Sequence, residues 1–160
     1  PALGPLVAAS AAPVILMHAQ GVPATMQDDP GYADVLLDVY DALAARLARA
    51  EALGIDRARI VLDPGIGFGK TLAHNLALLR GLSLFHGLGC PLLLGTSRKR
   101  FIGSIGKASE PRDRAPGSIA TALAGVAQGV QILRVHDVAE TRQALRLWQA
   151  LNTDHLEIET

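Results

Sequence analysis

Apolar residues occur along this chain in four short runs, and each run is followed by a stretch in which apolar and polar residues recur at helical spacing. The runs lie at Val14–His18, Ile60–Asp63, Leu92–Gly95 and Ile132–Val135. The first three runs are apolar up to their last residue, whereas the fourth is interrupted by Arg134. Apolar runs of this length are typical of strands that are buried on both faces. We therefore predict four strands of a parallel sheet, each followed by a crossover segment.

The helices are predicted from the segments around these runs. Tyr32–Leu53 carries apolar residues at helical spacing, and Gly54 is expected to end that helix. Helices are also predicted within Pro1–Ala12, Leu72–Phe85 and Gly117–Gln128. Gly103–Arg114, by contrast, is predicted to be polar and mobile.

The last helix is predicted to begin after Asp137. Asp is a favoured N-cap residue, and Glu140 lies three residues later, as in a capping box. Val138, Leu145 and Trp148 are expected on the inner face of this helix.

Strands that alternate with helices predict an α/β fold with right-handed connections and all strand carboxyl ends at one edge. That edge is where ligands bind in open and closed α/β sheets. Residues that can serve a site lie at or just after the end of each predicted strand, which predicts one shared site. The residues concerned are Met17, His18, Asp63, Ser97, Arg98, Lys99, Arg134 and His136.

Length and charge narrow the possibilities. A chain of 160 residues is enough for one domain, which we place at residues 1–151, with 152–160 as a tail. Lys plus Arg and Asp plus Glu number 15 each, so nothing favours nucleic acid or an anionic membrane as a partner. A single cysteine and the absence of a long apolar run favour the cytoplasm. The chain begins as if a helix were under way and without methionine, so we expect an N-terminal portion to be missing.

Asp63 leads into a proline and three glycines that end at Lys70. Two phosphate-binding patterns nearly match: Pro64 stands where a P-loop needs glycine, and Lys70 stands where a dinucleotide loop needs glycine. Asp63 itself could cap a turn or serve a ligand. His18 and His74 are interpreted as structural, because no second ligand lies at metal spacing.

Arg134 and His136 alternate on the last strand and are expected to face the same way. An arginine at a core position needs an anionic partner, because burying an unpaired charge is costly. Arg offers a fork that matches phosphate, Lys99 adds a point charge, and Asp63 can accept hydrogen bonds from the N–H edge of a heterocycle. These residues predict a site with a cationic end for phosphate and an acidic point for a ring.

The strings LMHAQGVPATMQ, DPGIGFGKT, GTSRKRFIG and GSIATALAGVAQGVQILRVHDVAET resemble, in order, the dihydropteroate synthase family, over Pro13 to about Leu151. The resemblance implies a (β/α)8 TIM barrel of which only the last four β/α units are present. It also implies transfer of a dihydropterin from 7,8-dihydropterin-6-ylmethyl diphosphate to p-aminobenzoate in folate biosynthesis.

The resemblance further implies the roles of individual residues. Asp63 and Lys99 would bind the pterin, and Arg134 and His136 the diphosphate, with Lys99, Arg134 and His136 as the catalytic residues. Ser97 and Arg98 would take part in substrate binding beside them. Met17, Leu93 and Gly95 would line the pterin pocket, and Gly67 and Phe68 would border p-aminobenzoate.

The family also implies Mg²⁺, with its protein ligand in the missing N-terminal half, and a homodimer of the full-length protein. Arg100 stands where serine is frequent in the family, so it receives no substrate contact. The fragment alone is expected to be inactive. Two alternatives stay open: a non-catalytic or methyltransfer pterin-binding domain, and a free-standing α/β binding module of four units.

Overall fold

Four short parallel strands form the centre of the computed structural model, which describes residues 3–22, 26, 28 and 30–152. They are β1 (Val14–Met17), β2 (Ile60–Asp63), β3 (Leu93–Leu94) and β4 (Ile132–Leu133). β1 pairs with β2 and β3 with β4, and a parallel bridge between Leu62 and Leu92 joins the two pairs. The strands therefore lie side by side in chain order, as predicted.

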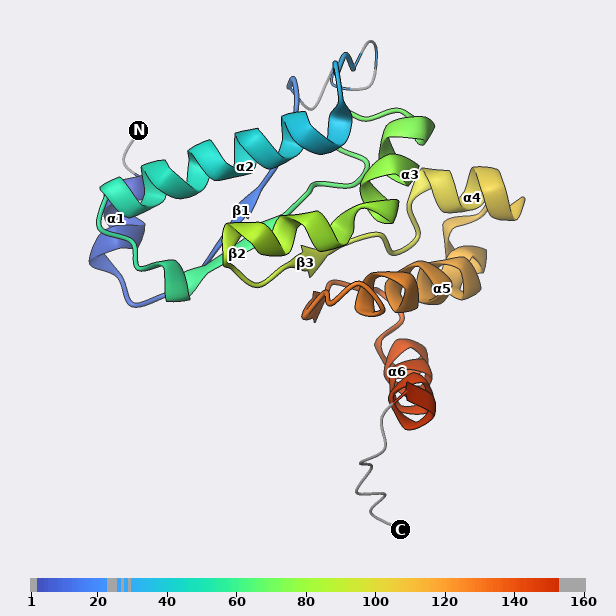
Figure 1. The fold of residues 1–160 in the computed structure, drawn as a ribbon. Helices are drawn as coiled ribbons and strands as arrows, with labels where there is room; N and C mark the ends of the chain where they lie inside the picture. The colour runs from blue at the N-terminus through green and yellow to red at the C-terminus, as the bar shows by residue number, and fades with distance from the viewer. Residues whose placement is uncertain (1–2, 23–25, 27, 29, 153–160) are drawn as a thin grey trace.

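Helices cover one face of these strands (Figure 1). The α-helices are α1 (Leu3–Ala9), α2 (Val35–Ala52), α3 (Leu72–Arg80), α4 (Arg100–Gly106), α5 (Ala115–Val126) and α6 (Val138–Asn152). Three short 3₁₀ helices join them: η1 (Arg57–Arg59), η2 (Leu82–Leu88) and η3 (Pro111–Arg114). α2 packs against α3 and α5 against α6, and α1 and α6 lie at opposite ends of the molecule (Figure 1).

α2 shows how the sequence pattern produces this packing. Asp34 caps the helix by accepting hydrogen bonds from the backbone N–H groups of Leu36 and Leu37. The helix begins at Val35, three residues after the predicted start, because this cap is non-helical. The apolar residues at helical spacing form the buried side of the helix, and they are Val35, Val39, Leu43, Leu47 and Ala50. Leu36, which shares this spacing, is only partly buried.

The two faces of the strands differ in burial. Ile60 and Leu62 on β2 have no exposed surface and face the helices. Val61 and Asp63 alternate with them and, by register, share the opposite face with Ile15 and Met17 of β1. Ile15 is 53% exposed, so this inner face is incompletely covered.

Two predictions of local structure were wrong. The helix predicted over Leu72–Phe85 ends at Arg80, because Gly81 leaves the helical conformation and the narrower η2 follows. Gly103–Arg114, predicted to be polar and mobile, is largely helical in α4 and η3. Arg114 holds the connection between them by donating to the carbonyl oxygens of Ala108 and Ser109.

The start of α6 also differs from the prediction. Both carboxylate oxygens of Asp137 accept hydrogen bonds from Arg98, so this side chain joins two loops where a capping box was predicted. Val138, predicted on the inner face, is 63% exposed, whereas Leu145 and Trp148 are partly buried. The predicted tail lies outside the described residues apart from Asn152.

Candidate functional site

The predicted site residues gather at the carboxyl ends of the four strands. Met17 and Asp63 are register partners at the ends of β1 and β2. Leu93 faces the same side of the sheet as Ile132, its register partner in β4. Gly95 and Arg134 lie two residues further along and therefore continue that face beyond the strands. The alternation of the strands thus directs these side chains to the inner face.

A cavity of about 200 Å³ lies between the ends of β3 and β4. It is lined by Gly95, Ser97, Lys99, Arg134, Val135 and His136. Gly95 leaves room for the guanidinium, because a Cβ there would lie 3.2 Å from Nε of Arg134. Four groups able to donate hydrogen bonds therefore converge on a cavity with no carboxylate in its lining, which suits an anion.

Arg134 enters this cavity from an exposed position, which corrects the prediction that it occupies a core position. β4 ends at Leu133, so Arg134 and His136 follow the strand instead of belonging to it. The argument from the cost of burying an arginine therefore fails. What favours an anion here is the convergence of donors.

Ser97 and His136 are connected directly. The Oγ of Ser97 accepts from the backbone N–H of His136 at 3.1 Å and lies 2.9 Å from its Nδ1. Ser97 is buried, so it fixes the ring of His136 across the two strand ends. His136 thereby presents its other ring nitrogen, Nε2, away from Ser97.

Arg98, predicted to take part in substrate binding, is paired with a side chain of the protein itself. Its guanidinium forms a two-pronged ion pair with Asp137, with N···O distances of 3.1 and 2.5 Å, and it does not line the cavity between β3 and β4. Its backbone has a positive φ of 58°, unusual for a residue with a side chain. Ser118 accepts from its backbone N–H, and Arg114 donates to its carbonyl oxygen. Arg98 thus holds the loop that carries Ser97 and Lys99.

Asp63 is the acidic group of the site and is 5% exposed. Its Oδ1 accepts from the backbone N–H of Gly65 at 2.7 Å. Burial raises the pKa of the Asp63 carboxyl, opposed by the Gly65 hydrogen bond and by the nearby charges of Lys99, Arg134 and Lys70. Because Gly65 donates to Oδ1, the other oxygen of Asp63, Oδ2, can accept from a donor on the inner face.

Lys99 lies between this carboxylate and the arginine. Its Nζ donates to the carbonyl oxygen of Ile66 and lies 4.7 Å from the centre of the Phe68 ring, a cation–π distance. Burial lowers the pKa of Lys99 to about 8, while Asp63 acts to raise it and Arg134 to lower it. The amine therefore still carries its charge for the most part near neutral pH.

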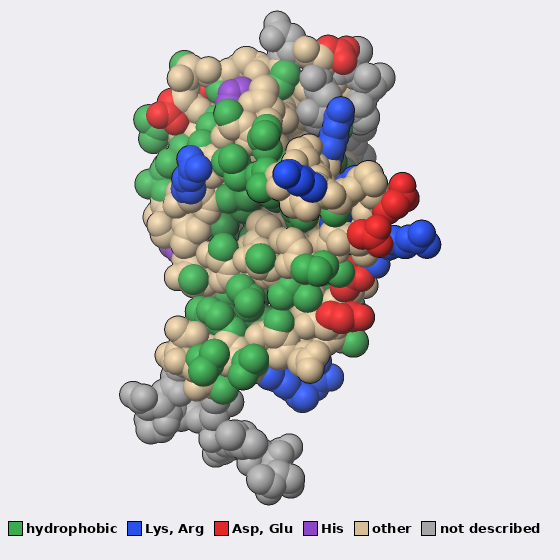
Figure 2. All heavy atoms as spheres, turned by 90° about the vertical axis from the view of Figure 1, so that its right-hand side faces the viewer, with side chains coloured by type: hydrophobic (Ala, Val, Ile, Leu, Met, Phe, Trp, Pro, Cys, Tyr) green, Lys and Arg blue, Asp and Glu red, His purple; other side chains and the backbone are tan. Residues whose placement is uncertain are grey.

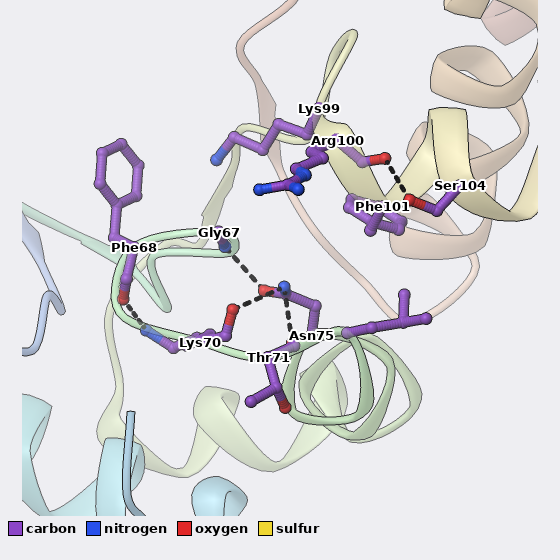
Figure 3. A pocket seen from close by; sticks show the side chains of 10 residues that line it. Gly67, Phe68, Lys70, Thr71, Asn75, Lys99, Arg100, Phe101 and Ser104 are labelled. Carbon is purple, nitrogen blue, oxygen red and sulfur yellow. Dashed lines mark hydrogen bonds between the residues drawn. The ribbon is translucent and has the colours of Figure 1, made fainter. Parts of the chain in front are cut away.

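A second cavity, of about 440 Å³, also has Lys99 in its lining (Figure 3). It is lined by Gly67, Phe68, Lys70, Thr71, Leu72, Asn75, Lys99, Arg100, Phe101 and Ser104. Figure 3 shows Lys99 and Arg100 reaching it from the start of α4, with Asn75 on α3 opposite them. Lys99 lines both cavities, so the two form one composite site.

The glycine-rich loop after β2 can follow only a narrow path. Gly65 has a φ of 69°, and a Cβ there would lie 1.7 Å from the carbonyl oxygen of His18. Glycine is thus required both by the backbone conformation and by the close approach of β1. This packing delivers Gly67 and Phe68 to the second cavity.

The sequence did not single out Lys70 or Asn75 as functional candidates, and His18, which was named at the end of its strand, was interpreted as structural. The Nζ of Lys70 lies 2.9 Å from Nδ1 of His18 and donates to the carbonyl oxygen of Phe68 at 3.1 Å. Asn75 accepts from the backbone N–H of Gly67 at 2.7 Å. The signal available in the sequence was Lys70 at the end of the glycine run, but its burial to 3% exposure depends on β1 and on Tyr32.

The residues of this site do not fit a divalent metal. Among the residues that the structure describes, no group of three His, Cys, Asp or Glu side chains is placed to hold one. Asp63, at the end of β2, interacts electrostatically with the cations Lys70, Lys99 and Arg134. Positive charge here would repel Mg²⁺ and attract an anion.

The chain matches one protein-family model and several known proteins. The family model described as "Pterin binding enzyme" matches residues 1–136. The dihydropteroate synthase of Neisseria meningitidis serogroup B is 51% identical over 141 residues, which are 86% of this chain and 50% of that protein. The Escherichia coli K12 enzyme is 47% identical over 138 residues, 86% of this chain and 49% of that protein. The chain spans about half the length of the curated relatives it matches.

Solved structures agree in fold. Thermus thermophilus dihydropteroate synthase in complex with 4-aminobenzoate aligns with a TM-score of 0.90 and 44% identity, covering 94% of this chain and 61% of that one. The Xanthomonas albilineans enzyme in complex with 7,8-dihydropteroate aligns at 0.89 and 42%, covering 97% and 56%. A further Thermus thermophilus structure contains 6HMPPP. Within the described residues, no helix is long and apolar enough to cross a membrane.

Proposed function

Because this chain belongs to the pterin-binding enzyme family, we propose that it supplies part of the active site of a dihydropteroate synthase. The reaction joins 7,8-dihydropterin-6-ylmethyl diphosphate to p-aminobenzoate and gives 7,8-dihydropteroate, diphosphate and a proton. The observation that carries the proposal is the composite site, in which Lys99 separates a cavity rich in cationic donors from a cavity beside Phe68. Two substrates of different chemistry suit two cavities that meet at one amine.

The diphosphate is proposed to bind at the ends of β3 and β4. Arg134 offers a guanidinium fork, His136 a ring nitrogen held in place by Ser97, and Lys99 an ammonium group. Hydrogen bonds from charged donors to phosphate oxygens are shorter and stronger than neutral ones. This end of the site would therefore bear the negative charge of the leaving group.

The pterin is proposed to bind on the inner face, beside Asp63. The Asp63 oxygen that Gly65 does not occupy can accept from the N–H edge of the ring. Met17 adjoins it at the end of β1, and Leu93 and Gly95 continue the same face on β3. The second cavity, with Gly67 and Phe68, would then receive p-aminobenzoate.

The residues present suit a dissociative reaction. The C–O bond between the pterin methylene and diphosphate breaks, the electron pair leaves with the diphosphate, and the amine nitrogen of p-aminobenzoate forms the new C–N bond before it loses a proton. Arg134, His136 and Lys99 stabilise the charge that develops on the leaving oxygen. The two cavities hold the reacting atoms on either side of Lys99, so orientation supplies the rest.

We also propose that the four β/α units are the C-terminal half of a (β/α)8 barrel, with residues 1–151 as that half. Support comes from the relatives, which are about twice as long, and from the inner face, which is exposed at Ile15 and Ile132. A barrel of this kind needs about 250 residues. Mg²⁺, if required, would take its protein ligands outside the residues described here, and the cytoplasmic location and the homodimer stay predictions.

A diphosphate-release assay with both substrates tests these proposals. We expect release from a chain in which residues 1–160 are joined to the N-terminal half of the Neisseria meningitidis relative, and none from residues 1–160 alone. Release by residues 1–160 alone would overturn the half-barrel proposal. If the joined chain folds and binds a pterin without releasing diphosphate, the non-catalytic pterin-binding alternative is favoured.

A further inference from the structure

We propose that Lys70, together with His18, is a positioning residue that sets the place of Phe68 at the second cavity. This inference rests on the function proposed above, because it concerns the side of the site assigned to p-aminobenzoate. Neither residue is needed for the proposed chemistry, and both are more buried than a surface loop requires: Lys70 is 3% and His18 6% exposed.

The ammonium group of Lys70 makes two directed contacts. It donates to the carbonyl oxygen of Phe68 at 3.1 Å and lies 2.9 Å from Nδ1 of His18 (Figure 3 shows the first). When Lys70 is protonated, its ammonium group has only donors, so Nδ1 of His18 accepts and the ring proton is on Nε2. The pair therefore connects the end of β1 to the backbone of the glycine-rich loop.

His18 is a rigid anchor for this contact. Its backbone N–H donates to the carbonyl oxygen of Asp63 at 2.9 Å, so it continues the pairing of β1 with β2. Burial, with Lys70 and Arg46 nearby, lowers the pKa of His18 to about 4, which keeps the ring neutral and able to accept. The acceptor is thereby fixed both in place and in protonation state.

The hydrogen bond from Lys70 to the Phe68 carbonyl oxygen affects the site through the position of the Phe68 ring. Asn75 holds the adjacent Gly67 from the α3 side, so the backbone of the loop is held from two directions. The Phe68 ring lies 4.7 Å from Nζ of Lys99, the residue shared by both cavities. A shift of the Phe68 carbonyl would move this ring and reshape the second cavity, while the diphosphate cavity between β3 and β4 has no contact with Lys70.

The burial of an amine is otherwise unexplained. Desolvation lowers the pKa of Lys70 to about 7, and Asp63 acts to raise it. Burying the charged form of this amine therefore costs free energy. A methionine of similar length would fill the same space without that cost. Retention of the amine thus fits a role for its hydrogen bonds.

The test is steady-state kinetics on the full-length natural protein that contains these residues, with Lys70→Met, Phe68→Leu and the double variant. Lys70→Met is expected to raise KM for p-aminobenzoate by about tenfold, near the lower end of what a hydrogen bond to a charged group contributes, and to change KM for the diphosphate substrate little. In the Phe68→Leu background, Lys70→Met is expected to add little further to KM for p-aminobenzoate, because its effect passes through that ring. Lys107→Met, an exposed lysine outside both cavities, is the matched control.

Each result decides the inference. Equal changes in both KM values, additive effects in the double variant, or no change would overturn it. Lys70→Gln keeps a donor but no charge and should give an intermediate KM, and it serves if the methionine variant does not fold. A wild-type protein that does not condense the two substrates overturns the proposed function itself, and this inference with it. A wild-type protein that condenses them, with Lys70→Met unchanged, overturns the inference alone.

Discussion

Two amines, the buried Lys70 and the partly buried Lys99, lie near one buried carboxylate, Asp63, and this grouping controls how the site responds to pH. Burial lowers the pKa of both amines, to about 7 and about 8. The site therefore loses positive charge as pH rises through this range. A solvent-exposed lysine would keep its charge to about pH 10.

The free energy of unfolding is expected to depend on Lys70 above pH 7. Between about pH 7 and its ordinary pKa of 10.5, Lys70 binds fewer protons in the folded than in the unfolded protein, so its contribution to stability rises with pH. Urea unfolding of the wild type and of Lys70→Met, at intervals from about pH 7 to about pH 9, measures this contribution. The wild type should gain relative to the variant as pH rises, with Lys107→Met as the control. A constant difference would contradict the lowered pKa.

Arg134 is expected to carry much of the affinity for the diphosphate substrate. Arg134→Ala should raise the dissociation constant of that substrate by about 10- to 100-fold, because it removes hydrogen bonds from a charged donor. Isothermal titration in the complete protein measures the change. Arg112→Ala is the control, since the Arg112 side chain is 82% exposed and its ion pair with Asp113 is a surface contact. An unchanged dissociation constant in Arg134→Ala would remove the anion site.

At the scale of elements, the Arg98–Asp137 ion pair connects the loop after β3 with the start of α6. Ser97 and Lys99 flank Arg98, and His136 precedes Asp137, so one ion pair orders residues on both sides of the anion cavity. Arg98 was predicted to contact substrate. In the structure Arg98 connects the two loops, because the pairing of β3 with β4 brings Asp137 next to it.

Breaking this ion pair is expected to raise KM for the diphosphate substrate several-fold. Arg98→Ala and Asp137→Ala should have similar effects, and the double variant should be little worse than either, because each change breaks the same contact. Arg57→Ala, which breaks an exposed pair with Glu51 far from the strand carboxyl ends, is the control. Additive effects in the double variant would show that the two residues act separately.

At the scale of the whole molecule, apolar surface is exposed where the proposed barrel would continue. The inner-face residues Ile15 and Ile132 are 53% and 38% exposed, and on α6 Leu147 and Leu151 are 62% and 76% exposed. Figure 2 shows hydrophobic side chains gathered on the lower part of the face where α6 lies. β1 and β4 also each lack a partner on one side within the described residues, and such edges favour further pairing.

Ile15→Lys tests whether this surface is covered in a longer chain. In residues 1–160 alone, the change should alter the free energy of unfolding by less than about 0.5 kcal/mol, because the position is exposed. In the chain joined to the N-terminal half of the relative, it should cost about 2 kcal/mol or more, because a charge would be buried in the barrel. Denaturant unfolding measures both values. Equal effects in the two chains would contradict the half-barrel proposal.

The sequence by itself determined the four parallel strands, the buried side of α2 and the positions of Asp63, Lys99, Arg134 and His136 at strand ends. These depend on local periodicity and on the fixed direction of parallel strands, and both can be read along the chain. The sequence motifs also indicated a family, and the family model that matches residues 1–136 agrees with that prediction.

Only the tertiary structure decided the partners of these residues. Lys70 meets His18 across 52 positions, and Arg98 meets Asp137 across 39, so neither contact leaves a local pattern. The exposure of Arg134 likewise follows from how segments pack after the strands have paired. The burial of a side chain and its long-range partners depend on which segments become neighbours. For these side chains, the neighbours are known only once the chain has folded.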